Sequence, residues 1–366
     1  MRNATAIMSR RQERTLRSIA DLVEAGLVPA PRAAALEPVA VRYQVALTPQ
    51  VAGLIDPTDP NDPIARQYLP SPAELRRTPE EHDDPIGDEA HSPLKGIVHR
   101  YPDRVLLKPL LVCPVYCRFC FRRERLGSDG ALGDAELEAA LDYVRGHDEI
   151  WEVILTGGDP LILSPRRLQA IIAALDAIPH VQVIRIHSRV PVADPERVAP
   201  ALLRALETDK ALYVAVHCNH PRELNDAARA ACLKLARAGI PLLGQSVLLK
   251  GVNDDGTTLE ALFRAMVAAR IKPYYLHQGD LAPGTAHFRT SIETGRRLMR
   301  QLRGRLSGLA QPTYVLDIPG GHGKVPVGPE FVSFGPGDAI ALTDPKGKRH
   351  HYAARPKGRV APRGPT

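Results

Sequence analysis

Residues 105–120 read VLLKPLLVCPVYCRFC, an apolar run of strand-forming residues that leads directly into three closely spaced cysteines. Cys113, Cys117 and Cys120 follow the pattern C-x3-C-x2-C. Thiolates are the soft ligands that iron–sulfur clusters need, and three of them leave one iron of a four-iron cluster without a protein ligand. A closed zinc site is less favoured, because it takes four ligands and no fourth Cys or His lies nearby. The spacing therefore predicts a [4Fe-4S] cluster with one open iron.

The cysteine count supports this interpretation. The chain of 366 residues has five cysteines, and an odd number with three so close together is not a disulfide framework.

No apolar run reaches the ~18 residues of a membrane-spanning helix, and the N-terminus lacks the apolar core of a secretory signal. We therefore expect a cytoplasmic enzyme without membrane attachment.

The formal net charge is +7, which raises the question of a nucleic-acid partner. Much of this charge lies at the two ends, in residues 10–17 and 346–363. The interior lacks a basic stripe interleaved with aromatic residues. We therefore expect no nucleic-acid partner, and some interior arginines remain available for an anionic substrate or cofactor.

Short apolar strands alternate with helical patterns along the middle of the chain. Strands are predicted at 105–113, 152–158, 181–188, 212–218, 241–249 and 272–278, and helices at 134–147, 164–178 and 225–239. Asp134 is the candidate N-cap of the first of these helices, and Gly239 ends the last. Six strand–helix units favour an α/β fold, a partial (β/α)6 TIM-like barrel with its active-site loops at the carboxyl ends of the strands.

The barrel is expected to carry extensions at both ends. We divide the chain into an N-terminal helical and irregular extension (1–95), the barrel (96–310), a C-terminal segment (311–354) and a basic disordered tail (355–366). The C-terminal segment is predicted to contain a Gly-rich turn region, 314–327, and a β-hairpin, 331–353. In the N-terminal extension, a helix is predicted from Ser9 to Ala25, and the Pro-rich stretch 57–85 is interpreted as an ordered wrap or a lid.

Two glycine-rich segments are candidate ligand loops. TGGDP (156–160) ends the second strand, where Gly157 and Gly158 would let backbone groups approach a ligand closely, although a tight turn is the simpler interpretation. Lys324 follows three glycines in PGGHGKVPV, which suits a Schiff-base lysine beside a flat cofactor. Val325 stands where a phosphate-binding P-loop needs Ser or Thr. A plain surface lysine in a turn remains open.

The cysteine spacing and the partial barrel resemble the radical S-adenosylmethionine (SAM) superfamily, in which the open iron binds SAM. Within it, the chain resembles the lysine 2,3-aminomutase family over about residues 40–330, with the order of motifs kept. These motifs are DPTDPNDP, HRYPDRVLL, CPVYCRFCFRR, TGGDPL, HSRVPV, GQSVLLKGVNDD, PYYLHQGDL, HFRT and YVLDIPGGHGKVPV. The resemblance implies three cofactors: the [4Fe-4S] cluster, SAM and pyridoxal 5'-phosphate (PLP).

The resemblance also implies roles for individual residues. Lys324 would be the PLP lysine, and Arg100 and Arg104 would bind the PLP phosphate, a task suited to guanidinium forks, with Tyr101 packing on the ring. Arg122 would pair with the substrate carboxylate. The SAM amino group would be held by Gly157, Gly158 and Asp159, and further contacts to SAM or PLP would come from Ser188, Arg189, His217 and Gln245.

Two acids bear on the substrate. Asp280 and Asp317 match positions where the family holds the side-chain ammonium of lysine, and a neutral or acidic side chain would leave both acids unpaired. The resemblance therefore implies an isomerase that interconverts L-lysine and β-lysine. Arginine is an alternative substrate because it is also cationic. The CFRR form of the cluster motif also occurs in relatives that act in the modification of elongation factor P, which gives a second alternative.

The implied partners are the substrate and an electron donor such as flavodoxin or ferredoxin. A homo-oligomer is possible. The chain has no cysteine after Cys232, and Asp255 stands where clostridial family members have a zinc-binding cysteine. We therefore expect no zinc between subunits.

Overall fold

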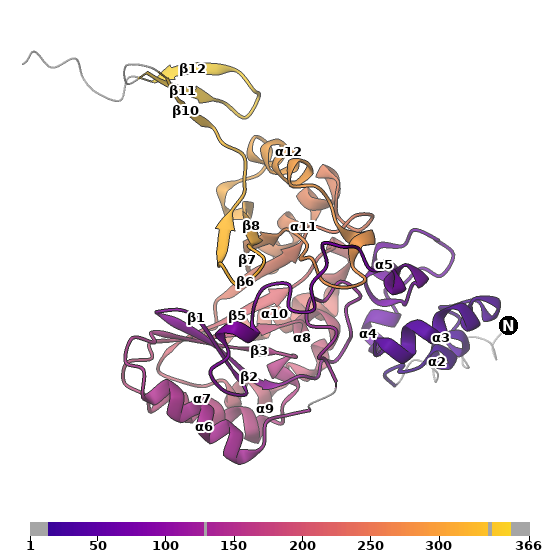
Figure 1. The fold of residues 1–366 in the computed structure, drawn as a ribbon, viewed down its shortest axis with the longest axis vertical. Coiled ribbons are helices and arrows are strands. Elements are labelled where there is room, and N and C mark those ends of the chain that lie inside the picture. Colours follow the sequence, from indigo (N-terminus) through magenta and orange to yellow (C-terminus); the bar gives the residue numbers. More distant parts are fainter. Residues whose placement is uncertain (1–13, 128–129, 336–338, 353–366) are drawn as a thin grey trace, which may run out of the picture.

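The computed structural model describes residues 14–127, 130–335 and 339–352. Its centre is a curved sheet of nine strands whose spatial order follows the chain (Figure 1). Strands β2 to β8 run parallel to their neighbours, whereas β1 and β9 extend the two edges in the antiparallel direction. The strands are β1 (Ile97–Tyr101), β2 (Arg104–Leu110), β3 (Glu152–Gly157), β4 (Val183–Ser188), β5 (Ala211–His217), β6 (Leu242–Val247), β7 (Ile271–His277), β8 (Thr313–Asp317) and β9 (Lys324–Pro326). The predicted partial barrel is confirmed, with each of its six strands within three residues of the expected ends.

The sequence prediction missed three strands of this sheet, β1, β8 and β9. The sequence predicted a Gly-rich turn region at 314–327, but Thr313–Asp317 forms β8, which pairs in parallel with β7. Only Tyr314 and Val315 of this strand are buried, so its sequence pattern is too short to separate from a turn. β8 and β9 therefore belong to the main sheet, and the proposed division of the chain at residue 310 stays a prediction.

Helices cover the outer face of the sheet (Figure 1). They are α6 (Asp134–Arg145), α7 (Pro165–Asp176), α8 (Val190–Ala193), α9 (Pro200–Ala205), α10 (Asp226–Arg237), α11 (Gly256–Ala268) and α12 (Ile292–Arg303). In α7, Leu168, Ile171, Ile172 and Leu175 are buried at the spacing of one helix face. Each such side chain contributes about 1.5–3 kcal/mol by leaving water.

The ends of the predicted helices are set by local caps. Gly239 has a φ of 81° and follows α10, as predicted. The N-cap of α6 is Gly133 and not Asp134, because the carboxylate of Glu136 accepts the Gly133 N–H at 2.9 Å. Asp134 is instead the first residue of the helix and pairs with Arg167 at the surface.

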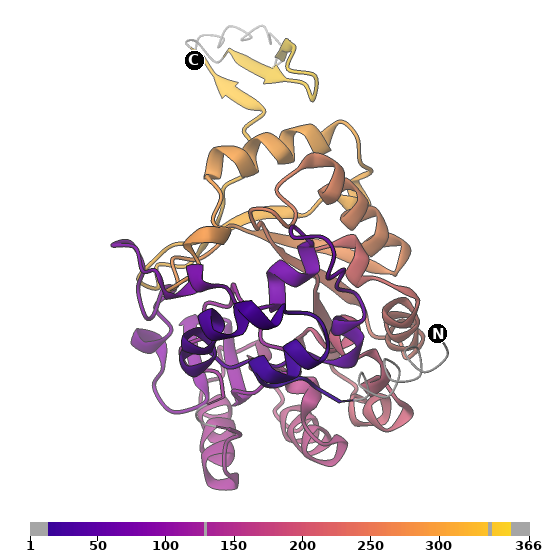
Figure 2. The same ribbon diagram turned by 90° about the vertical axis from the view of Figure 1, so that its right-hand side faces the viewer.

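The N-terminal extension packs across the barrel as a series of short helices (Figure 2). It contains α2 (Ile19–Glu24), α3 (Ala33–Arg42), α4 (Pro49–Ala52), α5 (Pro63–Tyr68) and 3-10 turns at Ala30–Arg32, Pro72–Leu75 and Glu89–His91. The helix predicted from Ser9 is shorter than expected: Ser18 and Asp21 form a capping box that starts α2 at Ile19. Residues 9–13 lie outside the described residues.

A buried ionic cluster joins this extension to the cysteine loop. The Glu74 carboxylate accepts hydrogen bonds from Arg118, at 2.6 Å from Nη2 and 2.9 Å from Nε, and from Arg123. Arg118 also donates to the carbonyl of Gln44 at 2.9 Å. Because Arg118 lies between two of the three cysteines, the extension helps to fix the shape of the loop that carries them.

The C-terminal segment ends in a second, antiparallel sheet that lies away from the barrel (Figures 1 and 2). It has three strands, β10 (Val332–Phe334), β11 (Ile340–Thr343) and β12 (Arg349–Tyr352), where the sequence predicted a single hairpin. The predicted disordered tail, 355–366, lies outside the described residues. Within the part of the chain that the structure describes, no helix is long and apolar enough to cross a membrane.

The ionic cluster gives a test of this arrangement. Replacing Glu74 by Gln would leave the buried Arg118 and Arg123 guanidiniums without an anion, which typically costs about 3–5 kcal/mol. We expect E74Q to lower the free energy of unfolding by that amount in urea titrations. The matched control is E138Q, which removes a surface ion pair with Arg145 and should change stability by less than ~1 kcal/mol. Equal stability of E74Q and E138Q would contradict the structural role of Glu74.

Candidate active site

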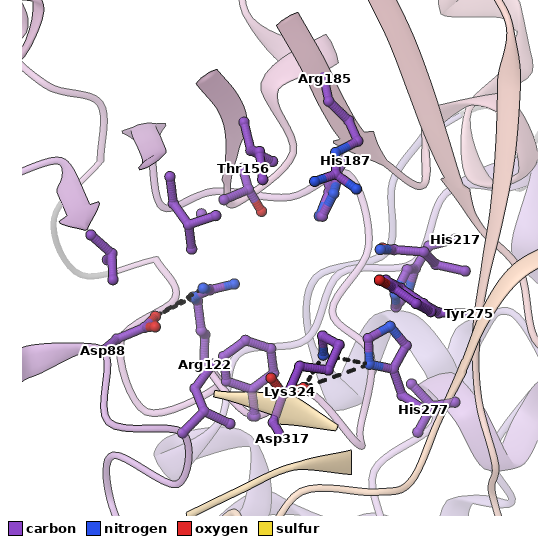
Figure 3. Close-up of a pocket in the computed structure, with 18 of the residues that line it drawn as sticks. Asp88, Arg122, Thr156, Arg185, His187, His217, Tyr275, His277, Asp317 and Lys324 are labelled. Carbon is purple, nitrogen blue, oxygen red and sulfur yellow. Dashed lines mark hydrogen bonds and ion pairs between the residues drawn. The ribbon is translucent and has the colours of Figure 1, made fainter. Parts of the chain in front are cut away.

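A cavity of about 840 Å³ lies inside the curve of the sheet. Every site residue predicted from the sequence lines it, together with residues that the sequence did not single out. Figure 3 shows part of this lining. The predicted residues in the lining are Arg100, Tyr101, Arg104, Cys113, Cys117, Cys120, Arg122, Gly157, Gly158, Asp159, Ser188, Arg189, His217, Gln245, Asp280, Asp317 and Lys324.

The three cysteines follow β2 at the mouth of the barrel, and their thiols are free. Burial raises the pKa of all three thiols, to about 11 for Cys117, and nearby negative charge raises that of Cys113 further. Thiolates here therefore need a bound cation. In the described residues, no three Cys, His, Asp or Glu side chains are placed to hold a single metal ion. A four-iron cluster fits this donor set better, because each cysteine would bind a different iron of such a cluster.

The TGGDP turn packs directly against the cysteine loop. The Gly158 N–H donates to Leu110 and the Asp159 N–H donates to Val112, at 2.8 and 2.9 Å. Gly157 has a φ of 103°, and a Cβ on Gly158 would overlap the carbonyl oxygen of Val112. The sequence predicted that glycine is needed here so that a ligand can come close to the backbone. In the structure, glycine at position 158 is needed because the backbone of the cysteine loop, at Val112, comes close to it.

The Asp159 carboxylate is buried, and its oxygens already accept hydrogen bonds from other groups of the protein. It accepts hydrogen bonds from Ser188 Oγ at 2.8 Å and from the N–H groups of Arg189, Val190 and Leu161 at 2.7–3.1 Å. These bonds join the loop after β3 to the loop after β4. The carbonyl groups of the two glycines are therefore better placed than Asp159 to receive an ammonium group.

Arg189 forms a buried polar cluster at the same end of the barrel. Its guanidinium donates to Glu223 at 3.0 Å and to Tyr68, and it lies 3.4 Å from Nδ1 of His217. Burial and the charge of Arg189 lower the pKa of His217, so this imidazole is neutral. Gln245 follows on the next strand, β6.

A second group of arginines lines another part of the cavity wall, where Asp88 joins Arg100 and Arg122. Figure 3 shows the contact of Asp88 with Arg122. Its carboxylate accepts from Arg122 at 2.8 Å and from Arg100 at 3.1 Å. Burial would raise the pKa of Asp88, but the charge and hydrogen bond of Arg122, together with the charges of Lys108 and Arg100, lower it. The Nε of Arg100 is buried and has no partner among the described residues, which leaves a donor for an anion such as a phosphate. The Arg104 guanidinium stacks on the Tyr101 ring, 3.7 Å from its centroid.

Lys324 begins β9, at the far edge of the sheet. Its backbone N–H donates to the hydroxyl of Tyr101 at 2.7 Å, which ties β9 to β1. Its Nζ pairs with Asp317 and lies 3.3 Å from Nδ1 of His277 (Figure 3). Burial would raise the pKa of Asp317, but its contacts with His277 and with the Lys324 ammonium lower it far below its usual range.

Asp280 completes the charged end of the cavity. Burial and the nearby charge of Asp317 raise the pKa of Asp280 to about 7, against the opposing charges of Lys324 and Arg122. Two carboxylates that repel each other in this way form a site for a cation.

The sequence interpretation missed Asp88, His187, Tyr275 and His277, which line the same cavity. His187 and His277 stand near the carboxyl ends of β4 and β7, as His217 does on β5. Polar residues at strand ends are thus the signal that could have found them. Asp88 had no such signal, because its partners are contributed by β1 and by the cysteine loop.

The chain was compared with known families and proteins. A family model described as the radical SAM superfamily matches residues 107–262, and one described as lysine-2,3-aminomutase matches residues 299–353. The L-lysine 2,3-aminomutase of Clostridium subterminale is 42% identical over 83% of this chain and 73% of its own length. The protein of that name from Escherichia coli K12 is 39% identical over 74% of this chain and 79% of its own. The glutamate 2,3-aminomutase of Clostridioides difficile is 37% identical over 86% of this chain and 74% of its own.

The contact between Gly158 and the cysteine loop is testable through the metal content. An alanine Cβ at Gly158 would push the backbone of Val112 away and displace the neighbouring Cys113. We expect G158A to retain less than about half of the wild-type iron after anaerobic reconstitution. G146A is the control, because Gly146 ends α6 with a φ of −82° and its Cβ would meet only ordinary contacts. Wild-type iron content in G158A would contradict the assigned packing.

Proposed function

The chain belongs to the lysine 2,3-aminomutase family of radical SAM enzymes, and we propose that the residues around its cavity bind L-lysine and orient it for amino migration. The protein is an isomerase that interconverts L-lysine and β-lysine, and its cofactors are a [4Fe-4S] cluster, SAM and PLP. The cluster and SAM supply radical chemistry, and PLP supplies an electron-delocalising ring. The protein supplies binding, orientation and exclusion of water.

The observation that supports lysine best is the pair Asp280 and Asp317 beside Lys324. The raised pKa of Asp280 reflects burial close to a second carboxylate, and a substrate ammonium would relieve this repulsion. One of the relatives is a glutamate aminomutase, so the substrate needs its own argument. A glutamate side chain would bring a third carboxylate to the same place, which costs several kcal/mol when charges are desolvated.

The other predicted site residues are assigned to the substrate carboxylate, to PLP, to the cluster and to SAM. Arg122 is proposed to bind the substrate carboxylate, which would compete with Asp88 for the guanidinium. Arg100 and Arg104 are proposed to hold the PLP phosphate, and the buried Nε of Arg100, which has no partner among the described residues, supports this role. Lys324 is proposed as the lysine that bonds to PLP. Cys113, Cys117 and Cys120 are proposed as the cluster ligands, with SAM between the TGGDP turn and the ends of β4 to β6.

The reaction also needs an electron from outside the chain. We propose a small electron-transfer protein such as flavodoxin or ferredoxin as the donor, because the cluster must be reduced by one electron. A homo-oligomer is compatible with the same site.

A substrate comparison tests the proposal. Protein reconstituted anaerobically with iron, sulfide, PLP and SAM should convert free L-lysine to β-lysine at least ~10²-fold faster, as kcat/KM, than L-glutamate or L-arginine. The variant D280N should lose most of this preference through a higher KM for L-lysine. Preferred turnover of glutamate or arginine would contradict the assigned ammonium site, and no turnover of free lysine would favour a role in modifying a translation factor.

The pKa of Asp280 predicts a pH dependence. The substrate ammonium binds the carboxylate form, which is present above about pH 7 and is lost as the pH falls. We expect the KM for L-lysine to rise about tenfold for each pH unit below 7, since one proton competes with the substrate. In D280N the KM should be higher than in the wild type above pH 7 and should no longer vary with pH, since the Asn side chain does not ionise. A pH-independent KM in the wild-type enzyme would contradict the assignment.

A further inference from the structure

His277 occupies a position that the proposed function does not use. It is the last residue of β7, and its Nδ1 lies 3.3 Å from Nζ of Lys324 and 3.7 Å from Oδ2 of Asp317. Figure 3 shows the three side chains converging from three neighbouring strands into the cavity. The lysine that is proposed to bond to PLP therefore has two contacts, one with a carboxylate and one with an imidazole.

The contact fixes the direction of the hydrogen bond. A lysine ammonium has only donors, so Nδ1 of His277 must accept. The imidazole is then neutral and carries its own proton on Nε2. This Nε2 is buried, and it has no partner among the described residues. His277 is thus held with a lone pair directed at the Lys324 ammonium.

We propose that His277 is the base that accepts the proton Lys324 must lose before its amine can bond to PLP. The proton moves from Nζ to Nδ1, the electron pair of the broken N–H bond stays on Nζ as the nucleophilic lone pair, and the imidazolium is stabilised by Asp317. The reverse transfer restores the ammonium when the substrate amino group takes the place of Lys324. This inference rests on the proposed role of Lys324.

The surroundings of His277 suit this role better than those of the two acids. Asp317 has a strongly lowered pKa and is a weak base, and no hydrogen bond joins Asp280 to Lys324 in the described residues. Burial and then the charge of Lys324 lower the pKa of His277, and Asp317 opposes them. Once the proton has moved, Lys324 is neutral and no longer lowers the pKa of His277. The imidazolium is therefore more stable after the transfer than the pKa of His277 beside a charged Lys324 suggests.

The other groups around His277 do not supply a competing charge. Tyr275 lies on the same strand, with its ring 5.6 Å from the imidazole, and burial raises the pKa of its hydroxyl. His187 on β4 and His217 on β5 both sense the charge of His277, and burial lowers the pKa of each. These three groups are therefore neutral near pH 7. Lys324 and Asp317 remain as the ionised neighbours that control the proton on His277.

Covalent binding of PLP gives a readout that does not depend on turnover. Cluster-containing protein freed of PLP would be mixed with PLP, and the rate of appearance of the covalent lysine–PLP absorbance followed across a range of pH. In the wild type, we expect this rate to rise with pH through the lowered pKa of His277 and to reach a plateau by neutral pH. In H277Q, we expect a rate about 10²-fold lower at neutral pH. This rate should keep rising with pH up to the range in which a free lysine amine loses its proton.

The controls separate this inference from the proposed function. H180Q changes a histidine outside the cavity, which contacts the carbonyl of Val144, and should behave as the wild type. K324A should lose the covalent absorbance; if it does not, the PLP role of Lys324 fails. If K324A loses it but H277Q keeps the wild-type profile, only the role of His277 fails.

Two further outcomes are decisive. Folded H277Q that never binds PLP would indicate a purely structural role and overturn the inference. If H277Q does not fold, the pH dependence of the rate of PLP binding in the wild type decides. A plateau by neutral pH supports His277 as the base, and a rate that rises steadily to the pH at which a free lysine loses its proton contradicts it.

Discussion

The active cavity depends on one closure, where the two edges of the nine-stranded sheet meet. The backbone N–H of Lys324 on β9 donates to the hydroxyl of Tyr101 on β1 at 2.7 Å. Next to it, the carbonyl of Gly321 contacts His91 at 3.2 Å. A side chain on Gly87 would overlap the backbone of Gly321, and one on Gly321 would overlap the His91 ring. A sheet of seven parallel strands is too short to close by strand pairing, so side chains and glycines close it.

This closure brings together charges that are far apart in the chain. Arg100 and Arg104 lie on β1 and β2 at one edge of the sheet. Asp317 and Lys324 lie on β8 and β9 at the other edge. Most of these groups already have a protein partner of opposite charge: Asp88 for Arg100 and Arg122, and Asp317 for Lys324. Ligands would thus bind largely by exchange of ionic partners, which keeps the buried charges paired in both states.

The sequence predicted the parts of the site that are local in the chain. The cysteine spacing, the strand ends and the lysine behind three glycines could all be read from short segments. The sequence could not predict Asp88 or the contact of His277 with Lys324, because their partners lie on other strands. It also could not predict that the glycines of TGGDP make room for the backbone at Val112, while the role of this turn in binding SAM stays a prediction. β8 was missed because two buried residues are too few to define a period.

The most direct measurement of the central claim is the site of covalent PLP attachment. Cluster-containing protein would be incubated with PLP, reduced with borohydride and digested, and the modified peptide identified by mass spectrometry. Closure of the sheet around Lys324 predicts a single phosphopyridoxyl group on that lysine, lost when Tyr101 and Arg104 are both replaced by alanine. Attachment at another lysine, such as Lys108 on β2, would contradict the account.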